Sequence, residues 1–368
     1  MWKYDENGNW ILVADAREEN PRSEPYYPPL QKENSAPFVF AKGSYEEHDQ
    51  APRVPSEFAR WKKPLIFYLL TWLSTTWIGS MMYGSGTFLS GLWFSVPLMI
   101  ILTAHELGHY FQSRRYRVGC SPPLFIPVPL PPFGTFGAVI RMDARIPNVK
   151  ALYDIGISGP LAGLVPTLVF MIIGIALSSV EIISLSGGSL IFGEPLLFRW
   201  VSMLFFDRSI PGTDLILHPI GMAAWTGLFI TSLNLFPMGQ LDGGHVFYAL
   251  LKRKAAWCSL ILFSLIVFLV IFYEQWNWSL MILLVMFFGI EHPPTCDDSV
   301  ALGLPRKVLG WLTLAFILIG FTPNPISEQA APPKKEAPRS KTIYSIRENP
   351  EYPVFSFCGS ERGTDERF

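Results

Sequence analysis

Long uncharged apolar runs constrain the fold of this chain most. Hydrophobic residues make up 50% of its 368 residues and charged residues only 16%, against about 25% charged in a typical soluble protein. Because a helix needs about 20 apolar residues to cross a bilayer, we predict an all-α polytopic membrane protein with about six or seven transmembrane helices. The predicted spans are 65–83, 88–110, 155–180, 219–236, 257–273, 278–290 and 308–321.

The polar ends of the chain set the predicted domain boundaries. Residues 1–61 are rich in Pro, Glu and Asn, which indicates a partly disordered cytoplasmic extension, either a dispensable tail or an arm that docks a partner. Residues 62–322 hold the predicted membrane domain, and the Pro-rich residues 323–368 indicate a flexible tail. Basic clusters flank the predicted spans so that all fall on the cytoplasmic side if the N-terminus is cytoplasmic.

Charge and cysteine content argue against several functions. A net charge of −1, without a basic stripe, gives no reason to expect nucleic acid binding. Cys120, Cys258, Cys296 and Cys358 are widely spaced, so they indicate neither a disulfide framework nor a thiolate zinc site. No signal-peptide pattern is visible and the acidic N-terminal residues are unlike a transit peptide, so we expect a bacterial inner membrane rather than an organelle membrane.

The pentapeptide His105-Glu106-Leu107-Gly108-His109 lies within the second apolar run. At i and i+4 the two histidines share one helix face and can bind a single Zn²⁺, while Glu106 is placed to act on a water that the metal activates. Ionisable side chains in hydrocarbon are costly and need partners. The pattern therefore predicts a hydrolytic zinc site within the membrane. The alternative is a structural or helix-capping cluster.

A third metal ligand is predicted at Asp242, where the fourth apolar run ends. Pro237, Gly239, Gly243 and Gly244 interrupt the helix there, so a carboxylate can turn inward and complete a His₂-carboxylate site with one open position. The alternative is that Asp242 only caps the helix that follows.

Residues 121–142 are too apolar for an ordinary loop and too rich in proline for a continuous helix. The alternation over 134–140 predicts a short membrane-associated strand or hairpin, covered by protein or lining a cavity. An unpaired edge of that strand beside the metal would bind an extended peptide by strand addition. Gly134, Phe136 and Gly137 are therefore predicted substrate-binding residues, with a plain connecting loop as the alternative.

Three motifs in this order resemble the site-2 protease family of intramembrane zinc metalloproteases. They are HELGH in an apolar helix, the strand-like GTFGAV and the later N-x-x-P-x-x-x-x-D-G-G-H, and the resemblance runs over residues 64–292. The stretches GTFGAVIRM, ISGPLAGL and LFPMGQLDGGHVFYAL, with the late HPPT, are most similar to the bacterial and plastid branch that includes the EGY proteins. The resemblance implies one Zn²⁺ per chain and a single-pass transmembrane substrate that another protease has already trimmed.

The resemblance also implies residue roles. His105, His109 and Asp242 correspond to the zinc ligands and Glu106 to the general base. Asn234 corresponds to an asparagine that helps to hold the substrate or the oxyanion.

The remaining histidines receive separate interpretations. His245 aligns with the histidine of DGGH, which implies a position beside the ligands or in contact with substrate, with a plain structural role as the alternative. His218 and His292 precede prolines at the ends of apolar runs, so they are predicted interface residues, and His48 is predicted to be solvated. The Gly- and Pro-containing helix 156–166 is predicted to line a cavity and supply a gate, or else to serve only packing.

These observations predict an intramembrane zinc endopeptidase that cleaves transmembrane substrates, with the lipid bilayer as its other partner. A zinc-binding scaffold or pseudo-protease has no chemical need for Glu106, which is intact. A metal transporter needs sites weak enough to release their ion, whereas three ligands with an adjacent base fit hydrolysis better. The oligomeric state is not predicted.

Overall fold

The computed structural model describes residues 2–4, 10–12, 57–84, 86–143, 145–182, 190–206 and 213–328. The chain divides into two compact units, Met1–Arg53 and Val54–Phe368. In the first unit, β1 (Trp2–Tyr4) pairs antiparallel with β2 (Trp10–Leu12). The predicted partly disordered extension thus includes one short strand pair, and its cytoplasmic location stays a prediction. His48, Cys358 and nearly all of the predicted C-terminal tail lie outside the described residues.

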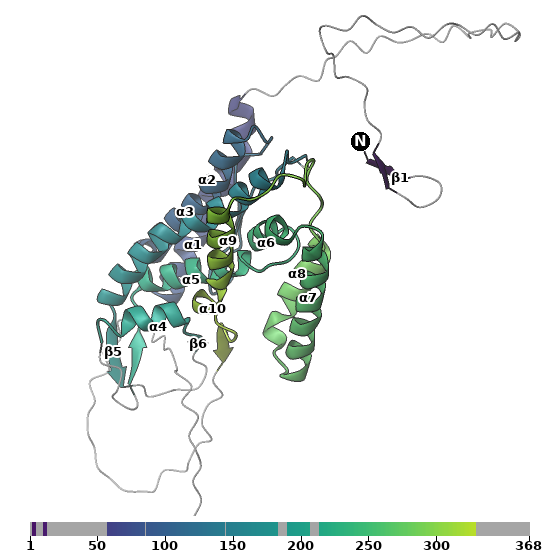
Figure 1. Cartoon of the computed structure of the whole chain (residues 1–368). Coiled ribbons are helices and arrows are strands. Elements are labelled where there is room, and N and C mark those ends of the chain that lie inside the picture. Colours follow the sequence, from purple (N-terminus) through teal and green to yellow (C-terminus); the bar gives the residue numbers. More distant parts are fainter. Residues whose placement is uncertain are drawn as a thin grey trace, which may run out of the picture. The chain divides into compact units, whose positions relative to one another are not determined.

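Four described helices are long and apolar enough to cross a membrane. They are α1 (Glu57–Met82), α2 (Leu92–Arg115) with the preceding 3₁₀ turn η1 (Phe88–Gly91), α3 (Val149–Ala176) and α7 (Lys254–Phe272). Figure 1 shows α1, α2 and α3 running alongside one another. The predicted membrane class is confirmed, but the count of six or seven helices is not.

The other predicted spans, and residues 242–251 where no span was predicted, form shorter helices that irregular segments separate. They are α5 (Pro219–Asn234), α6 (Asp242–Leu251), α8 (Ser279–Phe288), which follows the 3₁₀ turn η2 (Trp276–Trp278), α9 (Leu304–Ala315) and α10 (Ile317–Gly320). Proline starts α5 and the Gly- and Pro-containing residues 235–241 end it, because proline lacks the N–H that a helix interior requires. Non-helical backbone at membrane depth is tolerated where protein buries it or where it lines a cavity.

Close approach of backbones holds the central helices together. A Cβ at Gly108 of α2 would lie 2.5 Å from the carbonyl oxygen of Ser158 in α3, and a Cβ at Gly227 of α5 would lie 2.7 Å from Cγ2 of Ile101 in α2. Small residues at helix contacts are the usual means of dense packing in membranes. The main apolar core lies between these helices and includes the fully buried Trp225.

The predicted strand segment is a hairpin. β3 (Leu124–Pro127) pairs antiparallel with β4 (Thr135–Val139), with an irregularity in register before Pro127. The hairpin is fixed to α1 by a hydrogen bond of 2.7 Å from Ser74 Oγ to the Gly134 carbonyl oxygen and by the edge-on packing of Tyr68 against Phe125. The connecting-loop alternative is therefore wrong.

Two more antiparallel strand pairs form where the sequence predicted only a loop and a tail. β5 (Ser179–Ile182) pairs with β7 (Thr213–Ile216), and β6 (Leu190–Phe192) pairs with β8 (Ile326–Glu328). The short helix α4 (Leu196–Ser202) lies between them in sequence. Because β8 pairs with β6, residues 326–328 after α10 lie beside residues 190–192.

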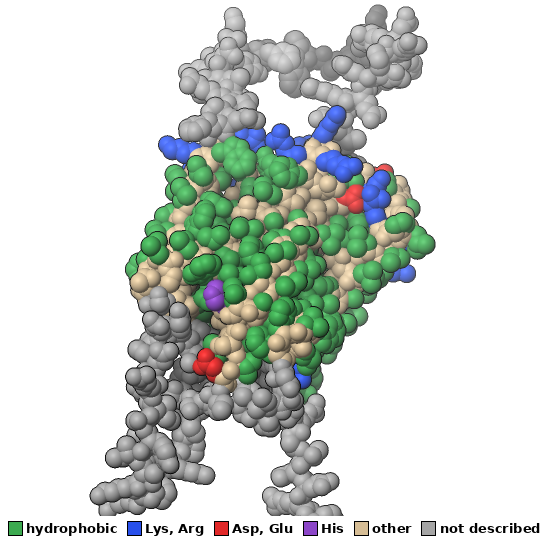
Figure 2. All heavy atoms as spheres, turned by 90° about the vertical axis from the view of Figure 1, so that its left-hand side faces the viewer, with side chains coloured by type: hydrophobic (Ala, Val, Ile, Leu, Met, Phe, Trp, Pro, Cys, Tyr) green, Lys and Arg blue, Asp and Glu red, His purple; other side chains and the backbone are tan. Residues whose placement is uncertain are grey.

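The molecular surface has the charge distribution of a membrane protein. Figure 2 shows one face with a broad band of hydrophobic side chains and with Lys and Arg gathered along one edge. The start of α1, the end of α2 and the start of α3 are basic in sequence and meet at one end of this helical array. For these three clusters the arrangement agrees with the prediction of a shared side of the membrane; the predicted side of residues 252–254 stays a prediction.

Candidate metal centre

Helix α2 presents three ionisable side chains to the protein interior. His105, Glu106 and His109 are 4%, 6% and 7% exposed. A spacing of four residues puts both histidines on one face of α2, and that face packs against α3. The carboxylate of Glu106 interacts electrostatically with both histidines and with Asp242.

The segment after α5 brings Asp242 to this face. Asp242 is the first residue of α6, after the cap residue Leu241. A Cβ at Gly243 would lie 1.9 Å from the Leu235 carbonyl oxygen, and a Cβ at Gly244 would lie 2.3 Å from the Gly239 carbonyl oxygen. The two glycines therefore allow the first turn of α6 to lie directly against the 235–241 segment, which turns the carboxylate inward.

His105, His109 and Asp242 converge although they are far apart in sequence. His105 Nε2 lies 3.1 Å from Asp242 Oδ2, and His109 Nε2 lies 3.2 Å from Asp242 Oδ1. The two Nε2 atoms are 3.2 Å apart. Ligand atoms at the corners of a zinc tetrahedron, with bonds of about 2.0–2.1 Å, are about 3.3 Å apart. The donor set and its spacing therefore fit a zinc ion.

A hydrogen bond behind His109 fixes which nitrogen faces the cluster. His109 Nδ1 lies 2.8 Å from the carbonyl oxygen of Ile155 in α3. A carbonyl oxygen only accepts, so Nδ1 carries the proton and the Nε2 lone pair is directed to the cluster, as metal-binding histidines require. The geometry of His109 is that of a metal ligand rather than of a helix cap.

Glycines of α3 make room for both imidazoles. A Cβ at Gly159 would lie 1.9 Å from His109 Nε2, and a Cβ at Gly163 would lie 3.0 Å from His105 Cβ. These contacts support the packing interpretation of helix 156–166. Its predicted role as a gate stays a prediction.

Asn234, at the last position of α5, lies beside the cluster. Its amide nitrogen Nδ2 is 3.4 Å from His105 Nε2, longer than a good hydrogen bond. The position is compatible with the predicted contact to a substrate carbonyl, and that role stays a prediction.

The three predicted substrate-binding residues of the hairpin differ in their surroundings. Phe136 is 67% exposed, and a Cβ at Gly137 would meet no atom within 4 Å. Gly134 is buried, and a Cβ there would lie 2.8 Å from Thr75 Cα. Among the described residues β4 pairs only with β3. Phe136 is thus open to a bound peptide. Gly137 is buried and its N–H donates a hydrogen bond of 3.0 Å to Thr135 Oγ1, and Gly134 packs against α1.

His292 has a contact that sequence reasoning missed. Instead of serving only as an interface residue, it places Nε2 2.7 Å from Nδ1 of the buried His245. The available signal was the HPPT sequence, which contributed to the family resemblance without giving His292 a role. His218 caps α5, since its Nδ1 accepts a hydrogen bond of 3.3 Å from the Ile220 N–H.

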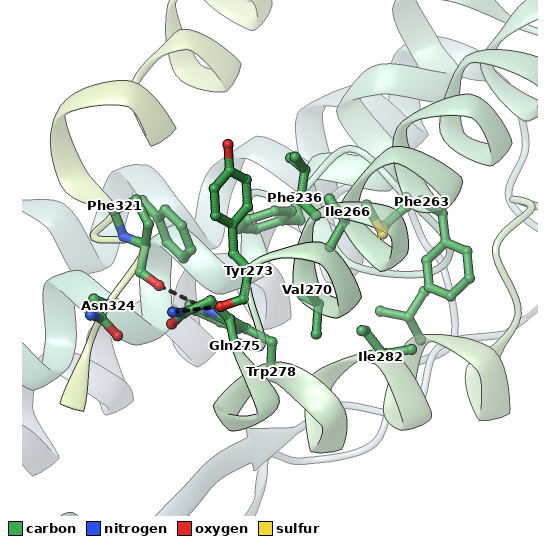
Figure 3. Close-up of a pocket in the computed structure, with 14 residues that line it drawn as sticks. Phe236, Phe263, Ile266, Val270, Tyr273, Gln275, Trp278, Ile282, Phe321 and Asn324 are labelled. Carbon is green, nitrogen blue, oxygen red and sulfur yellow. Dashed lines mark hydrogen bonds between the residues drawn. The ribbon is translucent and has the colours of Figure 1, made fainter. Parts of the chain in front are cut away.

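An apolar pocket of about 440 Å³ lies between α7, α8 and the residues that follow α10. Phe236 and Met238, from the segment between Asn234 and Asp242, form part of its wall. Figure 3 shows Phe263 and Ile282 toward one end of this pocket and Gln275 and Asn324 toward the other. The segment that positions Asp242 therefore also borders an apolar recess.

A buried His₂-carboxylate cluster with an adjacent glutamate, set on apolar helices, is typical of a membrane-embedded metallopeptidase. Comparison with known proteins agrees with this class. Residues 93–272 match the family model described as Peptidase family M50. The chain thus contains a peptidase M50 (site-2 protease) domain and is homologous to the EGY zinc metalloproteases.

Two relatives show the extent of the similarity. "Probable zinc metalloprotease EGY2, chloroplastic" of Arabidopsis thaliana is 30% identical over 158 residues, which are 43% of this chain and 28% of that protein. "Probable zinc metalloprotease EGY1, chloroplastic" of the same plant is 27% identical over 244 residues, 63% of this chain and 42% of that protein. The chain thus spans less than half the length of these relatives.

One solved structure, titled "Site-2 Protease from Methanocaldococcus jannaschii", is 22% identical to this chain. Its superposition has a TM-score of 0.33 and covers 61% of this chain and 84% of that one.

The relatives also bear on location. Their names place them in the chloroplast, so the expected bacterial inner membrane finds no support. What stands is that the protein belongs in a membrane, as its apolar helices indicate.

Proposed function

We propose that this protein is an intramembrane zinc endopeptidase that cleaves peptide bonds of single-pass transmembrane proteins. The observation that carries the proposal is the convergence of His105, His109 and Asp242 within 3.2 Å contacts. The two histidines lie on α2, which is apolar enough to span a membrane, and Asp242 begins α6. A zinc ion held there supplies Lewis acidity, which acidifies water and polarises a carbonyl group.

The side chains of the site divide the remaining work. Glu106 accepts a proton from the attacking water as the water oxygen bonds to the scissile carbonyl carbon, and then returns that proton to the departing amine nitrogen. The Asn234 amide N–H donates a hydrogen bond to the carbonyl oxygen, on which negative charge develops. His109 is held in one tautomer by the Ile155 carbonyl oxygen, so it needs no rearrangement during turnover.

The substrate has to be extended where it is cut, because the carbonyl groups of a helix are engaged in its own hydrogen bonds. The outer edge of β4, which carries the exposed Phe136, supports strand addition as the mode of binding. A transmembrane protein that another protease has already trimmed is the substrate class we propose. The chloroplastic relatives favour an organelle membrane as the location.

Cleavage of a panel of tagged single-pass substrates by the purified full chain in detergent tests this proposal. We expect cleavage to be lost in Glu106→Gln and on zinc chelation, while Glu106→Gln retains about one zinc per chain. Glu274→Gln makes the same chemical change at an exposed position and should cleave like the wild type.

Stoichiometric zinc without cleavage, tested with a substrate that is cut in cells, would favour the scaffold reading. Weak and exchangeable zinc would favour transport. Cleavage that survives Glu106→Gln would remove Glu106 as the base.

A further inference from the structure

Residues 289–298, between α8 and α9, lie along the segment that carries Asp242. We name them the strap. The Gly239 N–H donates a hydrogen bond of 2.8 Å to the Ile290 carbonyl oxygen, and His245 Nδ1 lies 2.7 Å from His292 Nε2. The Tyr248 hydroxyl donates a hydrogen bond of 2.6 Å to Asp298. The strap therefore holds the 235–241 segment and α6 at three successive points.

The hydrogen bond between His245 and His292 has a defined donor and acceptor. His292 Nδ1 lies 2.6 Å from the Pro293 carbonyl oxygen, which only accepts, so Nδ1 carries the proton. Burial lowers the pKa of His292 to about 4, so the ring is neutral at pH 7 and its Nε2 is an acceptor. His245 Nδ1–H is therefore the donor to His292.

His245 is also held from the opposite side. A Cβ at Gly156 of α3 would lie 2.7 Å from His245 Cβ, so α3 and the strap together enclose this side chain. His245 follows Asp242 by three residues, which is nearly one turn of α6. A rotation or shift of α6 that breaks the His245–His292 contact also moves the Asp242 carboxylate away from His105 and His109.

We propose that His292 is a positioning residue of the metal centre, which acts through His245 to fix α6 so that Asp242 faces His105 and His109. This inference rests on the proposed function for the identity of the metal and the reaction. Its physical basis is that groups around a metal site set ligand orientation, and loss of a direct partner of a ligand typically weakens metal binding or activity by about 10- to 100-fold. His292 acts one step further from the ligands, through His245 and the α6 backbone.

Zinc affinity measured by chelator competition on the purified full chain tests the proposal without relying on cleavage. We expect His292→Ala to bind zinc about 10- to 100-fold more weakly, and to lower kcat with little change in KM. His292→Gln places an amide oxygen near the position of Nε2, so it should recover most of the affinity. His218→Ala removes another half-buried histidine and should leave zinc affinity unchanged.

Wild-type zinc affinity in a folded His292→Ala chain would overturn the proposal. A zinc affinity in His292→Gln as low as that of His292→Ala would also overturn it. If His292→Ala does not fold, Tyr248→Phe removes only the hydroxyl bonded to Asp298 and should weaken zinc about 3- to 10-fold; unchanged affinity would then contradict the strap. If the zinc affinities follow this pattern but the wild type cleaves no substrate, the strap stands and the proposed protease function fails.

Discussion

At the scale of single residues, glycines decide whether the metal centre can form. The ligands are bulky, and space for them comes from missing side chains on α3 and α6. Gly159 faces His109, and Gly243 allows the start of α6 to touch the Leu235 carbonyl. The metal centre thus depends on glycines, which have no reactive side chain.

Gly159→Ala should disable the metal centre, because its Cβ would lie 1.9 Å from His109 Nε2. Alanine favours the helix over glycine by about 1 kcal/mol. A loss of zinc binding or activity in this variant therefore cannot come from a weaker α3 helix. We expect activity to fall about 100-fold, the typical result of a ligand displaced by about 1 Å, together with weaker zinc binding by chelator competition. Gly119→Ala, where the nearest atom is 3.7 Å away, is the control. Wild-type zinc affinity in Gly159→Ala would show that His109 does not occupy the position described.

At the scale of elements, the hairpin and the short α6 complete a site whose two histidines and glutamate lie on the long helix α2. The β3–β4 pair offers an unpaired strand edge among the described residues, and α6 offers Asp242 at its first position. Both follow Gly- and Pro-rich sequence, where the backbone can leave a helix. Irregular backbone is found within a membrane only where protein shelters it or where it lines a cavity.

Substrate should lie against β4. In a Glu106→Gln chain with its native cysteines replaced by serine, Phe136→Cys should form a disulfide with a cysteine near the cleavage site of a bound substrate. Ile261→Cys on α7 is equally exposed, since both native side chains are 67% accessible, and it should not cross-link. Equal cross-linking at the two positions, read on a gel, would exclude specific binding along the strand.

Some elements could be predicted from the sequence and others could not. The metal ligands carry their own chemical signature, and the alternation over 134–140 is a local pattern, so both were recognisable. The His245–His292 contact joins residues 47 apart and leaves no periodic trace. Strands β5 to β8 have three or four residues each, too few for alternation to be read. The Asn7-Gly8 pair between aromatic and aliphatic residues was a usable hairpin signal for β1 and β2 that was overlooked.

At the scale of the whole molecule, one ionic cluster joins three helices at the basic end. Arg306 near the start of α9 forms a two-point contact with Asp154 of α3, with Nε–Oδ1 at 2.7 Å and Nη2–Oδ2 at 3.0 Å. Tyr116, at the end of α2, donates a hydrogen bond to the same carboxylate. The cluster lies next to Ile155, whose carbonyl oxygen orients His109, so it connects the outer helix α9 with the metal centre.

Arg306→Met should lower the free energy of unfolding by about 1–2 kcal/mol. Hydrogen bonds to charged groups contribute about 1.5–3 kcal/mol, and the partial exposure of the Arg306 side chain, 36%, reduces the effect. Denaturant unfolding in detergent measures it. Arg145→Met removes an exposed ion pair with Asp143 at 3.8 Å and should change the free energy of unfolding little. An equal decrease in both variants would mean that the Arg306–Asp154 pair stabilises the protein no more than an exposed ion pair.

The two ends of the described membrane unit should face opposite sides of the membrane. The basic ends of α2 and α3 lie together, whereas β8 pairs with β6 at the far end of α3. Cysteines introduced at Arg115 and Asn324, both exposed, should react with an impermeant thiol reagent from opposite sides of sealed, oriented vesicles. Labelling of the cysteines at positions 115 and 324 from the same side would contradict the opposite placement of the α2 end and β8, which α9 and α10 precede in the chain.

X-ray absorption at the zinc edge of the purified full chain tests the central claim most directly, since it reports the ligands without requiring a substrate. The account predicts one zinc per chain, bound only by nitrogen and oxygen at about 2.0–2.2 Å, with scattering from two imidazoles. Asp242→Ala should remove one of these ligands. A sulfur ligand at about 2.3 Å, or a zinc shell that Asp242→Ala leaves unchanged, would contradict the site formed by His105, His109 and Asp242.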